Sequence, residues 1–107
     1  MEKRFFVYIL ASTRNGTLYV GVTSNLVQRI WQHKNGETGG FVAKHKVFHL
    51  VYFEPHDNAE SAIVREKRLK HWRRAWKLKL IEDVNPYWRD LYEEIQGEAS
   101  GFPLSRE

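Results

Sequence analysis

A carboxylate occupies a position that helical periodicity assigns to the inside of the protein. Steps of three and four residues along a helix predicted over 58–75 trace an inward stripe of Ala62, Glu66, Leu69, Trp72 and Trp76. A buried carboxylate must be paired or bind a cation, because desolvating it alone is costly. Hard oxygen ligands suit Mg²⁺, which takes one or two carboxylates together with water and phosphate oxygens. The alternative is an ordinary surface pair between Glu66 and Lys70, four residues further on.

Two tyrosines, Tyr8 and Tyr19, stand in two runs of strand-forming residues over 5–11 and 17–23. The segment between the runs contains Asn-Gly, which is typical of hairpin turns. A turn of two or four residues places both phenols on one face of the hairpin. Gly21 leaves that face without a side chain, so another group can approach the backbone. This pattern indicates a site as much as a core.

A guanidinium and an imidazole lie four residues apart on a helix predicted over 25–34. Arg29 and His33 therefore share one side of this helix. Because Leu26 and Ile30 form the buried stripe beside them, we expect Arg29 at the edge of the sheet. The alternative is a snorkelling arginine and a histidine at the boundary of the core.

The segment 65–79 is strongly basic, with eight lysines and arginines against Glu66. An excess of one sign favours contact with a phosphate backbone, whereas the alternative is a solvated helix face. The residues expected to contact nucleic acid are Lys67, Lys70, Arg73, Arg74 and Lys77. The tryptophans at 31, 72, 76 and 88 are expected in the core rather than as stacking platforms.

The order of predicted elements is β-β-α-β-α-α. After the hairpin and the helix over 25–34 come a mobile loop over 36–46, a strand over 49–54 ended by Pro55, and helices over 58–75, 76–83 and 87–95. Predicted capping boxes open two of the helices, at Asn25 with Gln28 and at Asp57 with Glu60. Asn85 precedes Pro86, and it is a cap or turn residue, or it orients a neighbouring loop or a substrate phosphate.

These elements predict an α+β fold in which helices flank a small three-stranded sheet, antiparallel or mixed. We expect the helices mainly on one face, with a shallow groove beside the hairpin. Residues 1–95 are predicted to form one domain, and residues 96–107 a flexible acidic tail.

Composition narrows the classes of function. The chain has 107 residues, a net charge of +4 and no cysteine, which excludes a disulfide scaffold and a cysteine-based zinc site and favours an acidic partner. The longest apolar run is too short to span a bilayer, so we expect a cytoplasmic protein without a membrane partner. Walker, dinucleotide-binding and metalloprotease motifs are not found in the sequence.

Val7-Tyr8-Ile9 and Tyr19-Val20-Gly21, closely spaced, resemble the paired motifs of the GIY-YIG nuclease superfamily. The chain also resembles this superfamily at four later polar positions: Arg29, His33, Glu66 and Asn85. The phrases YVGVTSNLVQRIWQHKNG and LVYFE are typical of its small stand-alone bacterial members. The resemblance spans roughly residues 5–90, most of a domain of ordinary size.

The resemblance implies hydrolysis of a nucleic-acid phosphodiester, with one Mg²⁺ or Mn²⁺ held by Glu66. It favours DNA as the substrate, and the choice between DNA and RNA stays open. Arg29 is then expected to stabilise charge on the phosphate. Tyr8 is expected to act as the base and Tyr19 to position water and phosphate, although the two roles can be exchanged. Free tyrosine has a pKa of about 10, so a nearby cation such as Arg29 is needed to lower it.

The supporting roles are less specific. His33 is expected to donate to the phosphate or to stabilise the phenolate, while Gly21 and Asn85 support the site. Two other classes of function stay open: a nucleic-acid binding module with little or no cleavage, and a protein-interaction adaptor. Val22 follows Gly21, and the lysine that several relatives carry near this position is absent, which favours the binding module. The substrate's sequence or shape, the oligomeric state and a protein partner for targeting also stay open.

Overall fold

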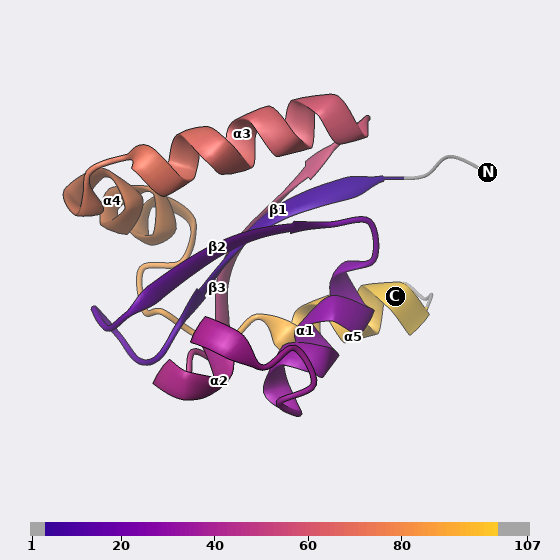
Figure 1. Cartoon of the computed structure of the whole chain (residues 1–107), viewed down its shortest axis with the longest axis horizontal. Coiled ribbons are helices and arrows are strands. Elements are labelled where there is room, and N and C mark those ends of the chain that lie inside the picture. The colour runs from indigo at the N-terminus through magenta and orange to yellow at the C-terminus, as the bar shows by residue number, and fades with distance from the viewer. Residues whose placement is uncertain (1–3, 101–107) are drawn as a thin grey trace.

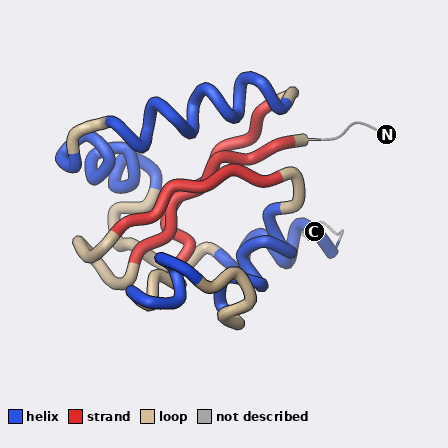
Figure 2. The backbone as a smooth tube through the Cα atoms, viewed as in Figure 1, coloured by secondary structure: helices blue, strands red, loops and turns tan. Residues whose placement is uncertain are grey.

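The computed structural model describes residues 4–100 of the chain, and the side chains of 97–100 are not part of that description. The elements in this range are β1 (Phe5–Ala11), β2 (Leu18–Thr23), α1 (Leu26–Lys34), α2 (Gly40–His45), β3 (His49–His56), α3 (Ala59–His71), α4 (Arg74–Val84) and α5 (Tyr92–Ser100). Figure 1 labels them along the chain, and Figure 2 shows the three strands side by side between helical layers. None of these helices has the length and apolarity needed to cross a bilayer.

The sheet has the order β2-β1-β3, and both strand pairs are antiparallel. The predicted α+β fold with a three-stranded sheet is confirmed. The β1–β2 turn spans residues 13–16, closed by a hydrogen bond from Ser12 N to Thr17 O of 3.0 Å. Asn15 takes a left-handed conformation with φ of 59°, which asparagine tolerates better than most residues.

Helices cover both faces of the sheet, so the expectation that they lie mainly on one face was wrong. In Figure 1, α3 and α4 lie above the sheet and α1, α2 and α5 below it. The reason lies in β1, whose side chains from Val7 to Ala11 are all buried. Alternate residues of this central strand enter two separate cores, because a continuous apolar run requires cover on both sides.

Two further expectations for the middle of the chain are corrected. Residues 36–46 contain the short helix α2, anchored by Val42 in the lower core and ended by Lys46 at φ of 55°. β3 continues through Pro55 to His56. Because β3 is an edge strand, a proline without an N–H is tolerated there.

The helix boundaries agree with the sequence in part. The predicted cap at Asn25 is confirmed, since its Oδ1 accepts a hydrogen bond from Gln28 N at 3.2 Å. At α3 the cap is Asn58 rather than Asp57, and its Oδ1 accepts from Ser61 N at 2.8 Å. α3 ends at His71, four residues before its predicted end, because the next two residues are extended.

The last helix also differs from its predicted range of 87–95. α5 starts at Tyr92 and runs to Ser100, so the predicted boundary between domain and tail falls within a helix. The remaining residues of the predicted acidic tail, 101–107, lie outside the described range.

The segment between α4 and α5 binds the outer edge of β3. Asn85 is buried, and its Nδ2 donates to the carbonyl of Val51, the extra residue in a bulge of β3. Asp90 Oδ1 accepts from Leu50 N at 3.2 Å, and Leu91 N donates to Leu50 O at 2.8 Å. Because this segment occupies the β3 edge, the β2 edge is the side of the sheet on which the strand order leaves room for a ligand.

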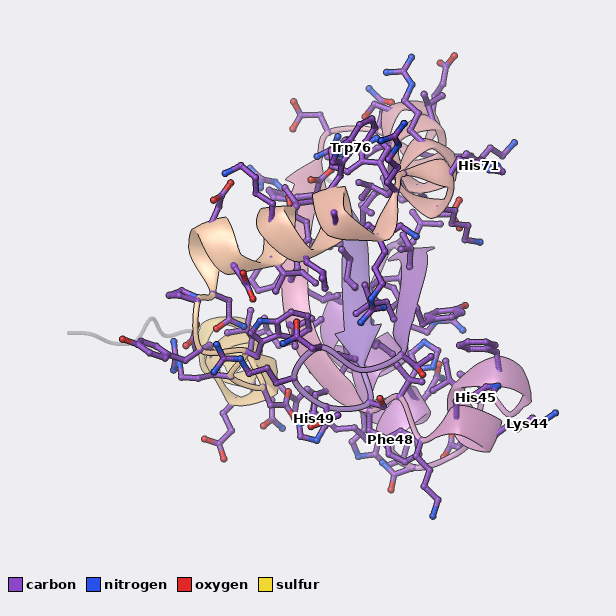
Figure 3. The ribbon with its side chains drawn as sticks, turned by 90° about the vertical axis from the view of Figure 1, so that its left-hand side faces the viewer. Lys44, His45, Phe48, His49, His71 and Trp76 are labelled. Atoms are coloured by element: carbon purple, nitrogen blue, oxygen red, sulfur yellow. The ribbon has the colours of Figure 1, made fainter. Side chains whose placement is uncertain are left out.

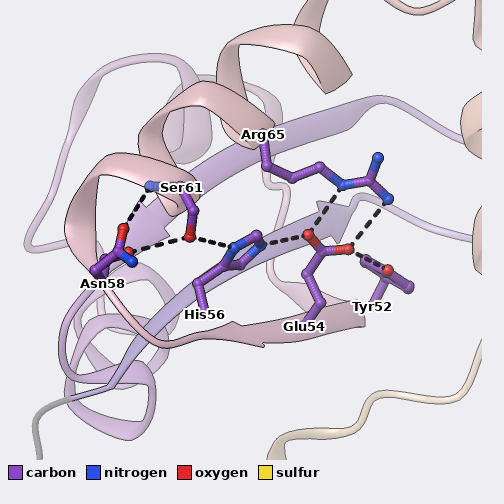
Figure 4. A network of polar contacts seen from close by, with 6 residues as sticks. All are labelled: Tyr52, Glu54, His56, Asn58, Ser61 and Arg65. Atoms are coloured by element: carbon purple, nitrogen blue, oxygen red, sulfur yellow. Dashed lines mark hydrogen bonds and ion pairs between the residues drawn. The ribbon is translucent and has the colours of Figure 1, made fainter.

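A polar network fixes α3 to β3 (Figure 4). Glu54 accepts hydrogen bonds from Arg65 Nε at 2.9 Å, from Tyr52 Oη at 2.5 Å and from His56 Nε2 at 2.7 Å. Burial alone would raise the pKa of Glu54, but the hydrogen bonds from these three residues outweigh it and hold the pKa below its usual value. The network sets the position of α3, the helix that carries Glu66.

Candidate active site

The two tyrosine motifs fit together through Gly21. Strand register pairs Tyr8 with Gly21 and Leu10 with Tyr19, so the prediction that both phenols share a face is confirmed. The phenol ring of Tyr8 lies across Gly21 and fills the bare patch that the sequence predicts there. Tyr8 is almost fully buried, and its ring centroid lies 6.4 Å from that of Tyr19.

A buried hydrogen-bond chain leads away from the Tyr8 hydroxyl. Its Oη lies 2.8 Å from His33 Nε2, and His33 Nδ1 lies 2.8 Å from Thr38 Oγ1. His33 is only 2% exposed, so it belongs to the interior and not to the boundary of the core. Burial, assisted by the positive charge of Arg29, lowers the pKa of His33 to about 4. The imidazole is therefore neutral at pH 7 and has one nitrogen free to accept a proton.

The charges of two helices converge on the same hydroxyl. Burial raises the pKa of Tyr8 above its usual value, the nearby Tyr19 and the negative charge of Glu66 raise it further, and Arg29 lowers it. Arg29 from α1 and Glu66 from α3 thus act on one buried phenol of β1. The expected effect of Arg29 is present but outweighed, so Tyr8 rests as a protonated phenol. Its Oη and Nε2 of the neutral His33 share a hydrogen bond, and the tautomer of the ring sets which atom donates.

Glu66 both faces inward and pairs with Lys70, the two interpretations that the sequence allowed. The residue is 8% exposed, so it faces inward, and its Oε2 lies 2.5 Å from Nζ of Lys70. Lys70 is half-exposed at the end of this pair. Among the described residues, no further hydrogen-bond partner is found for the second carboxylate oxygen.

The described residues contain no group of three or more histidine, aspartate or glutamate side chains that could hold a metal. A metal at this site would have Glu66 as a protein ligand. This donor set fits Mg²⁺, which commonly retains several waters and completes its shell with substrate phosphate oxygens.

A hollow of about 360 Å³ opens beside these residues at the outer edge of β2. It is lined by Leu18, Tyr19, Val20, Phe41, Lys70 and Lys77. In the view of Figure 3, His71 at the end of α3 and His45 on α2 lie toward the same side of the molecule, on opposite sides of the sheet. The hollow thus collects side chains from both helical layers around one sheet edge.

The five residues predicted to bind nucleic acid divide into two groups. Lys70 and Lys77 line the hollow, and Lys67 is exposed on α3. Arg74 instead donates to the carbonyls of Asn15 and Gly16 at 2.6 and 2.7 Å, so it fastens α4 to the hairpin turn. The guanidinium of Arg73 lies 5.4 Å from the ring centre of Trp76.

Other predicted positions do not join the site. Asn85 lies at β3, the opposite edge from β2, where it holds a loop. Trp31 and Trp76 are 46% and 53% exposed, so their assignment to the core was wrong. For Trp76 the cause is the break after α3, which ends the periodicity that placed it inside. Thr38, the partner of His33, was not predicted, because a single threonine in a loop gives no periodic signal.

The fold and the site define a small α+β domain in which paired phenols lie beside an imidazole, and the charges of a guanidinium and a carboxylate from two helices act on one phenol. A family model described as the GIY-YIG catalytic domain matches residues 4–79, and the chain belongs to the GIY-YIG family. The resemblance drawn from the motifs is therefore confirmed.

Several bacterial proteins are similar to this chain. A UPF0213 protein of Oceanobacillus iheyensis is 35% identical over 82 residues, covering 77% of this chain and 94% of the relative. One from Pediococcus pentosaceus is 33% identical over 78 residues, covering 73% and 81%. The solution NMR structure of a UPF0213 protein from Bacillus halodurans superposes with a TM-score of 0.51 at 26% identity, covering 81% of this chain and 92% of that one. The names of these relatives state no activity.

Proposed function

We propose that this protein is a metal-dependent endonuclease that hydrolyses phosphodiester bonds in nucleic acid, with DNA as the expected substrate. The observation that carries the proposal is the buried Tyr8–His33 pair, on whose phenol the opposite charges of Arg29 and Glu66 both act. Lys70 and Lys77 beside it suit the phosphates of a nucleic-acid strand.

Glu66 is the residue that would hold Mg²⁺ or Mn²⁺. Such a metal, when bound, polarises the scissile phosphate and offsets charge on the leaving oxygen. Because Lys70 Nζ contacts the same carboxylate, a bound metal would require the lysine to move away from Glu66 or both cations to contact the carboxylate together. Arg29, exposed on α1, is free to stabilise the charge that grows on the phosphate.

Proton transfer follows the Tyr8–His33 hydrogen bond. Since the raised pKa of Tyr8 disfavours a free phenolate, the phenol passes its proton to His33 Nε2 as it takes one from the attacking water. In the free protein, Arg29 helps to keep the pKa of His33 low. A substrate phosphate that neutralises Arg29 removes this effect and makes His33 a better proton acceptor. Tyr19, partly exposed at the hollow, positions the water and phosphate.

A nucleic-acid binding module without cleavage is the second candidate. The observation that favours it is the ion pair at Glu66, which leaves a single carboxylate already shared with Lys70. A protein-interaction adaptor would use the same basic surface without affinity for phosphate.

Nicking of supercoiled plasmid with Mg²⁺, and with EDTA in its place, tests the proposal. We expect Mg²⁺-dependent nicking that Glu66→Gln slows at least about 100-fold, while affinity for DNA in EDTA changes little. Glu60→Gln, which alters an exposed glutamate on the same helix, is the matched control and should nick normally.

The other outcomes separate the candidates. Nicking by Glu66→Gln at the wild-type rate would show that the metal assignment is wrong. Salt-dependent binding without nicking in Mg²⁺ or Mn²⁺ would identify a binding module. If the protein neither binds nor nicks DNA, the protein-interaction adaptor is the remaining candidate.

A further inference from the structure

An aromatic ring stands exposed at the mouth of the hollow. Phe41 on α2 is 47% exposed, its ring centroid lies 6.2 Å from that of Tyr19, and the two rings are inclined by 27°. The ring of His45, also on α2, is centred 4.4 Å from that of Phe41 and inclined to it by 42°. Phe41 therefore extends the aromatic surface of a predicted catalytic tyrosine out toward solvent.

The position of this ring is imposed by the helix that carries it. Val42, the next residue, is 3% exposed and belongs to the lower core, so α2 is anchored through it. Successive residues of a helix point about 100° apart, so burial of Val42 turns Phe41 outward. Val42 therefore packs α2 against the lower core, whereas Phe41 adds little to that core.

Two cationic side chains also line the hollow. Lys70 and Lys77 line the same hollow, and Lys77 Nζ donates to the backbone carbonyl of Lys70 at 3.3 Å. A hollow lined by an apolar ring and two lysines suits a ligand with one flat apolar face and adjacent negative charge. A nucleotide has both features, since every base offers a π-face and every linkage a phosphate.

We propose, building on the nuclease assignment, that this hollow is a subsite for one unpaired nucleotide. The base stacks on Phe41 beside Tyr19, and the flanking phosphates contact Lys70 and Lys77. The volume of about 360 Å³ lies within the roughly 300–1,000 Å³ typical of ligand sites. A base in an intact duplex presents no free face, because its neighbours stack on it. The substrate class is therefore single-stranded DNA, or duplex DNA with an extruded base.

Fluorescence anisotropy on the full chain in EDTA tests this, with three labelled DNAs of equal length: a single strand, a duplex with a one-base bulge, and a perfect duplex. We expect wild type to bind the perfect duplex most weakly. Phe41→Ala should weaken binding to the DNA with the unpaired base roughly 5- to 150-fold, the range found for loss of one stacked base. Its affinity for the perfect duplex should change less than about 2-fold.

Two further variants and measurements of melting temperature serve as controls for this experiment. Phe41→Trp should keep or improve affinity for the unpaired base, since the larger ring also stacks. Tyr87→Ala removes a residue that is 78% exposed and lies outside the hollow, and it should bind like wild type. Melting temperatures near that of wild type establish that the variants are folded.

Each outcome has a distinct meaning. Tighter binding to the bulged duplex than to the single strand identifies an extruded base, and the reverse identifies single-stranded DNA. Phe41→Ala binding like wild type on every DNA, or losing affinity equally on the perfect duplex, overturns the subsite while leaving the nuclease proposal intact. Wild type that binds none of the DNAs overturns both.

Discussion

A Cβ atom placed on Gly21 would lie 2.4 Å from the hydroxyl oxygen of Tyr8 and equally close to the carbon that bears it. A real Cβ atom does not approach a non-bonded atom so closely. The second tyrosine motif therefore needs glycine at this position for a steric reason. A side chain here would clash with the ring of Tyr8, which belongs to the first motif. This contact couples the two motifs directly and holds the phenol against His33.

Gly21→Ala should consequently destabilise the protein by roughly 1–3 kcal/mol, the usual cost of overpacking a core. The methyl group meets a buried aromatic ring, which cannot swing away as a flexible chain can. Urea denaturation measures the loss. If the Tyr8 ring is the cause, Gly21→Ala should destabilise the protein less in a Tyr8→Leu background, because leucine is shorter than tyrosine and has no ring. An equal cost in both backgrounds would mean that the strain arises elsewhere, in the backbone of β2.

Acid should weaken the fold through His33. Its pKa is about 4 in the folded protein against 6.5 for the free side chain, so the unfolded chain binds more protons between these values. The free energy of unfolding is then highest above pH 6.5 and falls as the pH drops toward 4, by up to roughly 3 kcal/mol. Denaturant titrations at pH 7.5 and pH 5 measure this fall. Proton NMR should show the ring of His33 titrating with a midpoint of about 4.

The control for this prediction is His33→Gln, which keeps a hydrogen-bonding side chain but cannot take up the proton. It is expected to lose stability at pH 7.5 and then to change less than wild type on acidification. An identical decrease in wild type and variant would assign the acid sensitivity to groups other than His33, and not to the Glu54 network. That network should lose stability only at lower pH, because the pKa of Glu54 lies below its usual value.

Lys70 should compete with a metal for Glu66. Its ammonium lies 2.5 Å from the carboxylate, so a divalent cation has to overcome an existing ion pair and a like charge. Lys70→Gln is expected to bind Mn²⁺ about 10-fold more tightly, equivalent to about 1.4 kcal/mol, in calorimetry or electron paramagnetic resonance without DNA. The same variant should bind DNA more weakly, with a salt dependence smaller by about one ion.

Lys67→Gln is the matched control for Lys70, because it removes an exposed lysine from the same helix without touching the ion pair. It should leave the affinity for Mn²⁺ unchanged. Glu66→Gln should abolish the site in either background. Equal Mn²⁺ affinity in wild type and Lys70→Gln would show that the lysine does not restrain the metal.

Local signals in the sequence determined a large part of the fold. Alternation in the two strand runs and the Asn15-Gly16 turn set a register that puts Tyr8 and Tyr19 on one face. Asn25 capped its helix as its side chain predicted. Glu66 faced inward as its place in the helical stripe indicated. Each of these features depends on neighbours a few residues away, and such interactions are encoded by short-range spacing.

Other features had no local signal. α2 has six residues and begins among glycines, so it is too short to show periodicity. α3 ends without glycine or proline at its boundary, which left the exposure of Trp76 unpredicted. Asn85 was grouped with the site from its order in the chain, whereas its hydrogen bonds lie along β3.

By itself, therefore, the sequence determined the types of the reactive groups, the strands and helices that carry them, and the family. Only the tertiary structure decided which sheet edge stays open, that His33 is neutral, that Tyr8 is protonated, and that Phe41 shares a hollow with Lys70. The reason is physical: pKa values and clefts depend on burial and on charges brought together from distant segments. Helical cover of both sheet faces is what produces that burial, and it arises when the chain packs as a whole.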